Sequence, residues 1–145
     1  MNFENVGIGD INGEIDFYSL PESYDKPNWL QQLGTFDKKS IEFNLAEMPQ
    51  LIEKITTQKV KVVTLGEIME KYKIQSLDVL VVDAEGYEYN ILKALPHLAV
   101  KPQIIQFEWG SMNETSYRDL IELLKALNYT LFKNGGDMTA IDLNQ

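Results

Sequence analysis

Three carboxylates stand directly after apolar segments of the chain, in positions where they could carry chemistry. Asp83 and Glu85 follow the run LDVLVV, and Glu108 follows PQIIQF. Asp83 and Glu85 are two residues apart, so they share one face if the strand continues through them. Paired carboxylates at a strand end can bind a cation or take a proton from a hydroxyl group. We therefore interpret these three acids as candidate site residues.

Each of these acids also has a purely structural explanation. Asp83 or Glu85 could cap the helix expected after Gly86, because an acid at a helix N-terminus stabilises it by roughly 0.3–1 kcal/mol. Glu108 could form an ion pair with a neighbouring lysine or arginine. The residue types alone leave both alternatives open.

A second candidate position is the Gly9-Asp10 pair, which follows the short apolar segment at residues 5–9. An aspartate in a turn with Asn12 and Gly13 commonly serves the geometry of the turn. We expect strands at residues 5–9 and 14–20, joined by this turn, and a ligand role for Asp10 is the alternative.

The elements that must position the acids alternate between strand and helix. Apolar, β-branched runs at residues 59–64, 77–82 and 101–109 alternate with helical spacing at residues 65–72, 87–95 and 116–127. Crossovers of this length favour parallel strands, and the unbroken run at 77–82 is typical of a central strand covered on both faces. A strand at 129–133 and the turn at Gly135-Gly136 complete an antiparallel hairpin.

The sequence therefore predicts an α/β fold: a Rossmann-like, open, mostly parallel sheet with helices on both faces and an antiparallel C-terminal hairpin. In such sheets ligands bind outside the carboxyl ends of the strands, where the three acids stand. Residues 1–145 are expected to form a single domain. The segment at about 21–58 lacks a sustained period; a strand at 40–45 and a short helix at 48–55 are expected there, in an insertion on the substrate side.

Composition excludes several classes of function. The net charge of -9 opposes binding to nucleic acid or to anionic membranes. With no cysteine and one histidine, neither a disulfide framework nor a zinc-thiolate or multi-histidine centre can form within the chain. Apolar stretches are too short to span a bilayer and the start lacks signal-peptide character, so a cytoplasmic location is expected. Phosphate-binding glycine loops and a nucleophile elbow are absent.

Taken together, SLDVLVVDAEGYEYNILKAL, KPQIIQFEW and LIELLKALNYTLF resemble the second half of FkbM-type methyltransferases. Members carry a strand ending in Asp-x-Glu-Gly-x-Glu, and Asp83, Glu85, Gly86 and Glu88 stand on the matching positions, with Glu108 on the acid that ends the next strand. NVGIGDINGEIDFY resembles the third strand of the family and its turn.

The resemblance implies a fold, a cofactor and roles for residues. The implied cofactor is S-adenosylmethionine, and the implied reaction is methyl transfer to a hydroxyl of a small molecule or glycan. Asp83 would lie near the methyl donor and the acceptor, Glu85 and Glu108 would be further catalytic acids, and Gly9 and Asp10 would approach the adenine. No metal is assigned, although a divalent cation at Asp83, Glu85 and Glu108 is an alternative.

The resemblance also predicts a domain truncated at its N-terminus. The glycine-rich first strand and the acidic ribose-binding tip of the second strand would precede residue 5, and this chain does not contain them. The remaining strands could close up, with residues 5–9 beside residues 77–82, or a second copy of the chain could fill the gap as a homo-oligomer. A non-catalytic α/β remnant that binds a protein partner is the alternative function.

Overall fold

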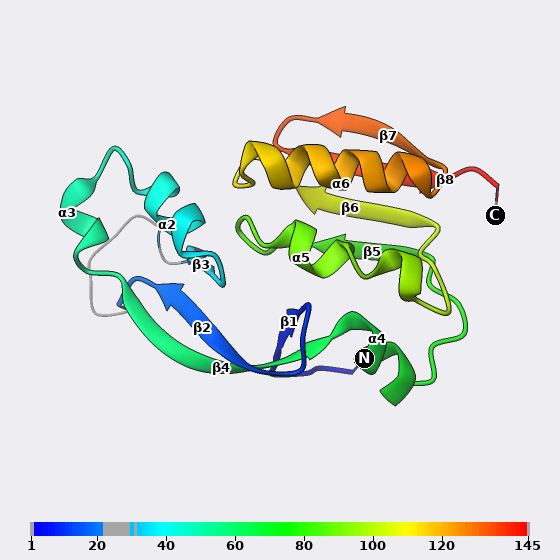
Figure 1. The fold of residues 1–145 in the computed structure, drawn as a ribbon, viewed down its shortest axis with the longest axis horizontal. Coiled ribbons are helices and arrows are strands. Elements are labelled where there is room, and N and C mark those ends of the chain that lie inside the picture. The colour runs from blue at the N-terminus through cyan, green and yellow to red at the C-terminus, as the bar shows by residue number, and fades with distance from the viewer. Residues whose placement is uncertain (1, 22–29, 31, 145) are drawn as a thin grey trace.

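A computed structural model of the protein describes residues 2–21, 30 and 32–144, and its strands form two four-stranded sheets. Sheet A has the strand order β1-β4-β2-β3, and sheet B has the order β5-β6-β8-β7 (Figure 1). The strands are β1 Gly7–Gly9, β2 Gly13–Ser19, β3 Gly34–Thr35, β4 Thr56–Thr64, β5 Val79–Val82, β6 Ile104–Glu108, β7 Tyr129–Asn134 and β8 Asp137–Asp142. Within the described residues only the β1–β4 and β5–β6 pairs are parallel. The mixed α/β class is confirmed, but the expected single, mostly parallel sheet is not what these strands form.

Among the residues that the structure describes, the helices are short except for one. They are α2 Lys38–Asn44, α3 Pro49–Ile52, α4 Leu65–Lys71, α5 Glu88–Leu92, the 3-10 helix Leu95–His97 and α6 Glu114–Ala126. Thr64 is the N-cap of α4, because its hydroxyl accepts a hydrogen bond from the Glu67 N–H. In the part of the chain that the structure describes, no helix has the length and apolar character needed to cross a membrane.

Strand β4 is the centre of sheet A. The backbone of Val62 is paired with Gly13 of β2 on one side and with Gly7 of β1 on the other. A Cβ atom at Gly7 would lie 2.8 Å from Cγ1 of Val62, so the glycine permits this close pairing. The expectation that residues 5–9 lie beside residues 77–82 is therefore wrong, because β1 pairs with β4 instead.

The segment that the sequence left least readable contains a helix where a strand was expected. Residues 38–44 form α2 rather than the strand expected at 40–45. Ile41 and Leu45 are four residues apart and both fully buried, which is the spacing of one helix face, and the Asp37 side chain caps the helix by accepting from the Lys39 N–H. The expected helix at 48–55 exists in a shorter form as α3.

Sheet B holds the main core on one face only. Leu120 and Leu124 of α6 pack with Ile105 and Phe107 of β6 in one buried cluster, together with residues of α5. On the opposite face of β5, Val79 and Val81 are 50% and 62% exposed. The expectation of a central strand covered on both faces is wrong for residues 77–82: in the described chain β5 is an edge strand, and the helices α5 and α6 lie on one face of sheet B (Figure 1).

Candidate functional site

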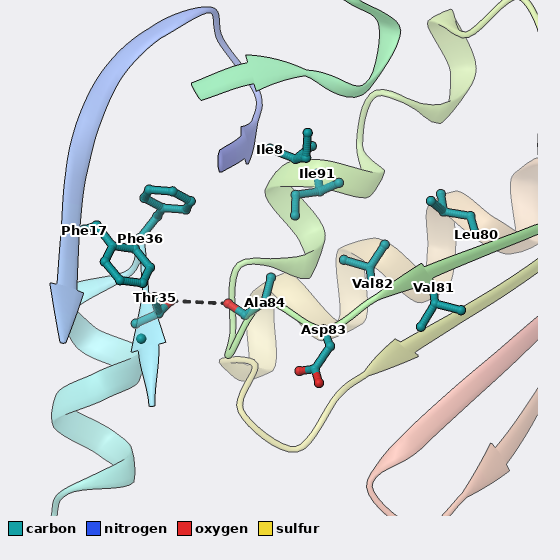
Figure 2. A pocket seen from close by; sticks show the side chains of 11 residues that line it. Ile8, Phe17, Thr35, Phe36, Leu80, Val81, Val82, Asp83, Ala84 and Ile91 are labelled. Carbon is teal, nitrogen blue, oxygen red and sulfur yellow. Dashed lines mark hydrogen bonds between the residues drawn. The ribbon is translucent and has the colours of Figure 1, made fainter. Parts of the chain in front are cut away.

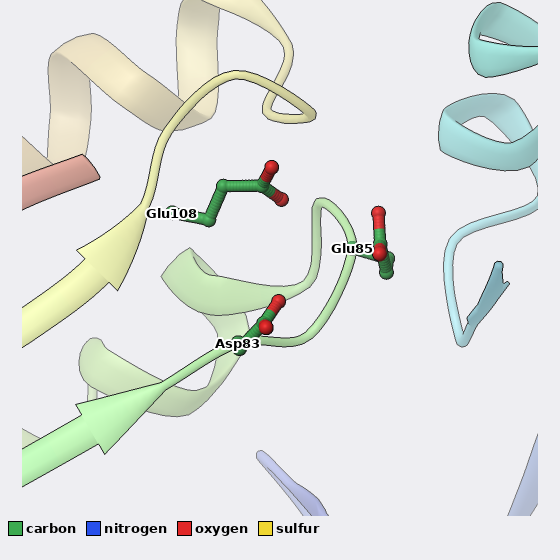
Figure 3. A group of neighbouring side chains, drawn as sticks. All are labelled: Asp83, Glu85 and Glu108. Atoms are coloured by element: carbon green, nitrogen blue, oxygen red, sulfur yellow. The ribbon is translucent and has the colours of Figure 1, made fainter. Parts of the chain in front are cut away.

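Three carboxylates meet where β5 and β6 end. The two strands are parallel, and Val82 pairs with Phe107, so the next residues, Asp83 and Glu108, stand side by side at the same edge of sheet B. Glu85 completes the group, and one carboxylate oxygen from each of the three acids lies within 4.8 Å of the others (Figure 3). The structure thus brings together all three acids that the sequence singled out from different segments.

Glu85 reaches this group through a turn and not along a strand. Strand β5 ends at Val82, and the chain reverses through Glu85 with φ of 49° and Gly86 with φ of 97°. The expectation that Asp83 and Glu85 share a face of one strand is therefore wrong. A non-glycine residue in the left-handed region is uncommon and needs support from its surroundings.

Glu88 supplies part of that support. Its Oε1 accepts hydrogen bonds from the N–H groups of Ala84 and Gly86, at 2.9 and 3.3 Å, so one carboxylate holds both sides of the turn. The side chain is fully buried, and its Oε2 has no hydrogen-bond partner among the described residues. Burial raises the pKa of Glu88 to about 7. The sequence marked Glu88 only through its place in the motif.

The helix-capping explanation of the acids does not hold. The N-cap of α5 is Tyr87, which makes no side-chain capping hydrogen bond. Neither Asp83 nor Glu85 occupies the cap position. Their placement at the strand end is thus not explained by the needs of the helix.

Burial and mutual repulsion favour the protonated forms of two acids in the group. Burial raises the pKa of Glu85, and the charges of Glu108 and Asp83 raise it further. Burial likewise raises the pKa of Glu108, despite an opposing hydrogen bond with Ser111. Such a site attracts a positively charged group and contains a carboxylate suited to accepting a proton.

Residues 35–40 dock directly onto the turn that carries Glu85. The hydroxyl of Ser40 in α2 donates to the carbonyl oxygens of Glu85 and Ser111, at 2.7 and 3.1 Å. The hydroxyl of Thr35 in β3 donates to the Ala84 carbonyl at 3.4 Å. Ser111 in turn donates to Oε2 of Glu85 at 3.3 Å. The segment without a readable period therefore frames the acidic group.

We expect the substitution Ser40→Ala to loosen this frame. Removing the buried hydroxyl leaves two carbonyl groups without their donor, which costs about 1–2 kcal/mol of unfolding free energy. Urea denaturation followed by circular dichroism measures the change. Ser19→Ala is the control, because the Ser19 hydroxyl lies in an exposed contact with Thr56 Oγ1 at 3.4 Å, and its loss should cost less than about 0.5 kcal/mol. Equal losses would contradict the role of Ser40.

An apolar cavity of about 300 Å³ runs along β5 and ends at the acidic group. We call it the β5 cavity. Leu80, Val82 and Asp83 line it from sheet B, and Phe17 and Phe36 line it from the other side (Figure 2). The two phenyl rings contact each other edge to face at a centroid distance of 5.2 Å. Asp83 therefore belongs both to the wall of this cavity and to the acidic group.

Gly9 and Asp10 lie at the end of β1 and are not part of the acidic group. The Asp10 carboxylate accepts from Lys93 Nζ at 2.7 Å and from the Tyr87 hydroxyl at 3.2 Å. Partial burial opposes the ionised form, but the interactions with Lys93 outweigh it and lower the pKa of Asp10. The carboxylate thus ties β1 to α5. A contact of Gly9 and Asp10 with adenine stays a prediction.

Comparison with known proteins gives one match. A family model described as the methyltransferase FkbM domain matches residues 1–131. No curated protein and no solved structure matches the chain. The match covers both sheets up to β7, including the three acids and the turn between them.

Proposed function

The chain belongs to the FkbM methyltransferase family, and on that premise we propose that it transfers a methyl group from S-adenosylmethionine to a hydroxyl group of a small molecule or glycan. The observation that carries this proposal is the convergence of Asp83, Glu85 and Glu108 at the ends of β5 and β6. In α/β proteins, ligands bind beyond the carboxyl ends of the parallel strands. The acidic group therefore stands where donor and acceptor would meet.

The residues present fit the proposed donor. S-adenosylmethionine carries a positively charged sulfonium, and the three carboxylates of the acidic group offer the complementary charge. The flat faces of its adenine ring can pack against the apolar side chains of Phe17, Phe36 and Leu80 in the β5 cavity. When bound, the cofactor supplies an electrophilic methyl group.

We assign Glu85 as the base. Glu85 would accept the hydroxyl proton of the acceptor, while bound S-adenosylmethionine would supply the methyl group, exchanging its S–CH3 bond for the new O–CH3 bond and leaving as the neutral thioether. Burial and the neighbouring charges raise the pKa of Glu85, which strengthens it as a proton acceptor. Ser111 orients this carboxylate through its hydrogen bond to Oε2. Asp83 faces the donor side, since it lines the β5 cavity.

Isothermal titration of the 145-residue chain with S-adenosylmethionine and with S-adenosylhomocysteine tests the proposal. We expect both to bind, and Asp83→Asn to weaken S-adenosylmethionine by roughly tenfold or more, because the variant removes a charge beside the sulfonium. The same variant should lose less affinity for S-adenosylhomocysteine, because the sulfur of this thioether carries no charge. Glu108→Gln should act in the same direction, which guards against a fold defect peculiar to one variant.

Asp16→Asn is the matched control, since it removes the same charge from β2, where Asp16 pairs with Lys59 at 2.8 Å. Its Kd values for S-adenosylmethionine and S-adenosylhomocysteine should equal those of the unchanged chain. If the folded chain binds neither cofactor form, or if all three variants bind alike, the methyltransferase proposal fails. Absence of binding by a chain with a native circular dichroism spectrum would favour the alternative, a non-catalytic interaction module.

A further inference from the structure

A second cavity is lined by the two serines that bind Glu85. It has a volume of about 670 Å³ and lies between α2 and the start of α6, and we call it the α2–α6 cavity. Its volume falls within the range of roughly 300–1,000 Å³ that is typical of small-molecule sites. Beyond Ser40 and Ser111, its lining comprises Asp37, Lys39, Phe43, Met112, Asn113 and Glu114.

Two hydroxyls link the lining of the α2–α6 cavity to Glu85, which is not itself a lining residue. Ser40 and Ser111 line the cavity, and these same side chains donate to the carbonyl oxygen and to Oε2 of Glu85. Each cavity thus contains either a member of the acidic group or a hydrogen-bond partner of one, and the two cavities differ in character. The β5 cavity is apolar and includes Asp83, whereas the α2–α6 cavity has a mixed lining and adjoins Glu85.

The side chains of the α2–α6 cavity point to the chemistry of its ligand. Phe43 is 69% exposed and offers an open aromatic face, beside the thioether of Met112 and a polar rim. An aromatic face with a rim of hydroxyl, carboxylate and amide groups suits a ring compound that has an apolar C–H face and hydroxyls at its edge.

The charges of the α2–α6 cavity disfavour an anionic ligand. Asp37 and Glu114 outweigh Lys39 among the lining residues, and the acidic group lies next to them. One N–H group in the first turn of each helix is already capped, because Asp37 accepts from the Lys39 N–H and Asn113 accepts from the Ser116 N–H. A phosphate or carboxylate would therefore meet repulsion from the carboxylates of Asp37 and Glu114.

We propose that the α2–α6 cavity binds the methyl acceptor and that this acceptor is a neutral carbohydrate, its ring resting on Phe43 with one hydroxyl directed at Glu85. The assignment as an acceptor site rests on the proposed methyltransferase function. The carbohydrate itself is inferred from the lining and the charge of the cavity, which are independent of the methyl donor.

Ligand-observed NMR titration with methyl β-glucopyranoside, methyl β-galactopyranoside and glucose 6-phosphate tests the proposal. We expect at least one neutral glycoside to bind with a millimolar Kd, and Phe43→Ala to weaken it by roughly fivefold or more, since stacking on an aromatic ring contributes about 1 kcal/mol. Phe132→Ala is the control, because Phe132 is a phenyl of β7 that is 51% exposed and does not line the cavity. Glucose 6-phosphate should bind more weakly than the neutral sugars.

Three results would overturn the proposal: no glycoside binds, the two phenylalanine variants lose affinity equally, or the phosphorylated sugar binds most tightly. Binding of the methyl donor is measured separately. If the chain binds S-adenosylhomocysteine but no glycoside, the carbohydrate site is contradicted and the methyltransferase proposal is not. A chain that binds a glycoside at Phe43 but no cofactor form contradicts the methyltransferase function, and with it the role of the sugar as acceptor.

Discussion

Replacing Gly86 with alanine should cost the protein about 3 kcal/mol of unfolding free energy or more. Gly86 has φ of 97°, a conformation that side chains with a Cβ rarely adopt. An added Cβ atom would also lie 2.6 Å from the Ser111 carbonyl oxygen and would overlap the Ser40 side chain. Ser40 and Ser111 are held in place, because the Ser40 hydroxyl donates to the carbonyl oxygens of Glu85 and Ser111. The melting temperature should fall by roughly 10 °C.

Gly135→Ala separates the two causes of this loss. Gly135 has φ of 60°, and a Cβ atom there would meet nothing within 4 Å. Its replacement should cost only the conformational part, about 1 kcal/mol. Differential scanning calorimetry of both variants gives the comparison. Similar losses would mean that the contacts of Ser40 and Ser111 with the Gly86 turn do not constrain it.

Local patterns in the sequence predicted the C-terminal half of the chain well. The apolar run before Asp83, the helical spacing in residues 116–127 and the Gly135-Gly136 turn each match an element of sheet B or its covering helix. These elements bury one continuous core, so their periodicity is fixed by the face that packs. The meeting of Asp83 and Glu108 follows from the same logic, because strand ends in parallel pairs meet at one edge.

What the sequence could not predict depends on long-range pairing. Nothing in residues 5–9 distinguishes pairing with β4 from pairing with β5, because either partner buries the same short apolar segment. Residues 40–45 alternate in a way that suits a strand, and only the contact of Ile41 and Leu45 with the smaller core shows them as a helix. Tertiary packing overrides such short local patterns.

The site shows the same division between local and long-range information. Asp83 and Glu108 can be recognised in the sequence as acids that directly follow apolar strands. The turn that brings Glu85 to them depends on partners distant in sequence. Ser40 is 45 residues away from Glu85. A hydroxyl that binds a carbonyl so far along the chain leaves no signal in a single sequence, and the α2–α6 cavity could not be predicted for this reason.

Glu88 should make the protein less stable as the pH rises from 5 to 8. Its pKa is about 7 in the folded chain against an ordinary value of 4.5, so the folded state holds its proton more tightly than the unfolded state does. The stabilisation from this proton is fully present below pH 4.5 and is lost as the pH passes 7. A difference of this size corresponds to about 3 kcal/mol. Glu85 and Glu108 add in the same direction, because their pKa values are also raised.

Glu88→Gln isolates the contribution of this carboxyl. The amide oxygen can still accept from the Ala84 and Gly86 N–H groups, as Oε1 of Glu88 does, but the side chain no longer titrates. Urea denaturation at several pH values should give a curve for the variant that is much flatter than for the unchanged chain, with the variant more stable at pH 8. Glu122→Gln, at an exposed position of α6, should leave the original slope in place. A slope that survives unchanged in Glu88→Gln would contradict the role of Glu88 and would assign the pH dependence to other groups with raised pKa values, such as Glu85 and Glu108.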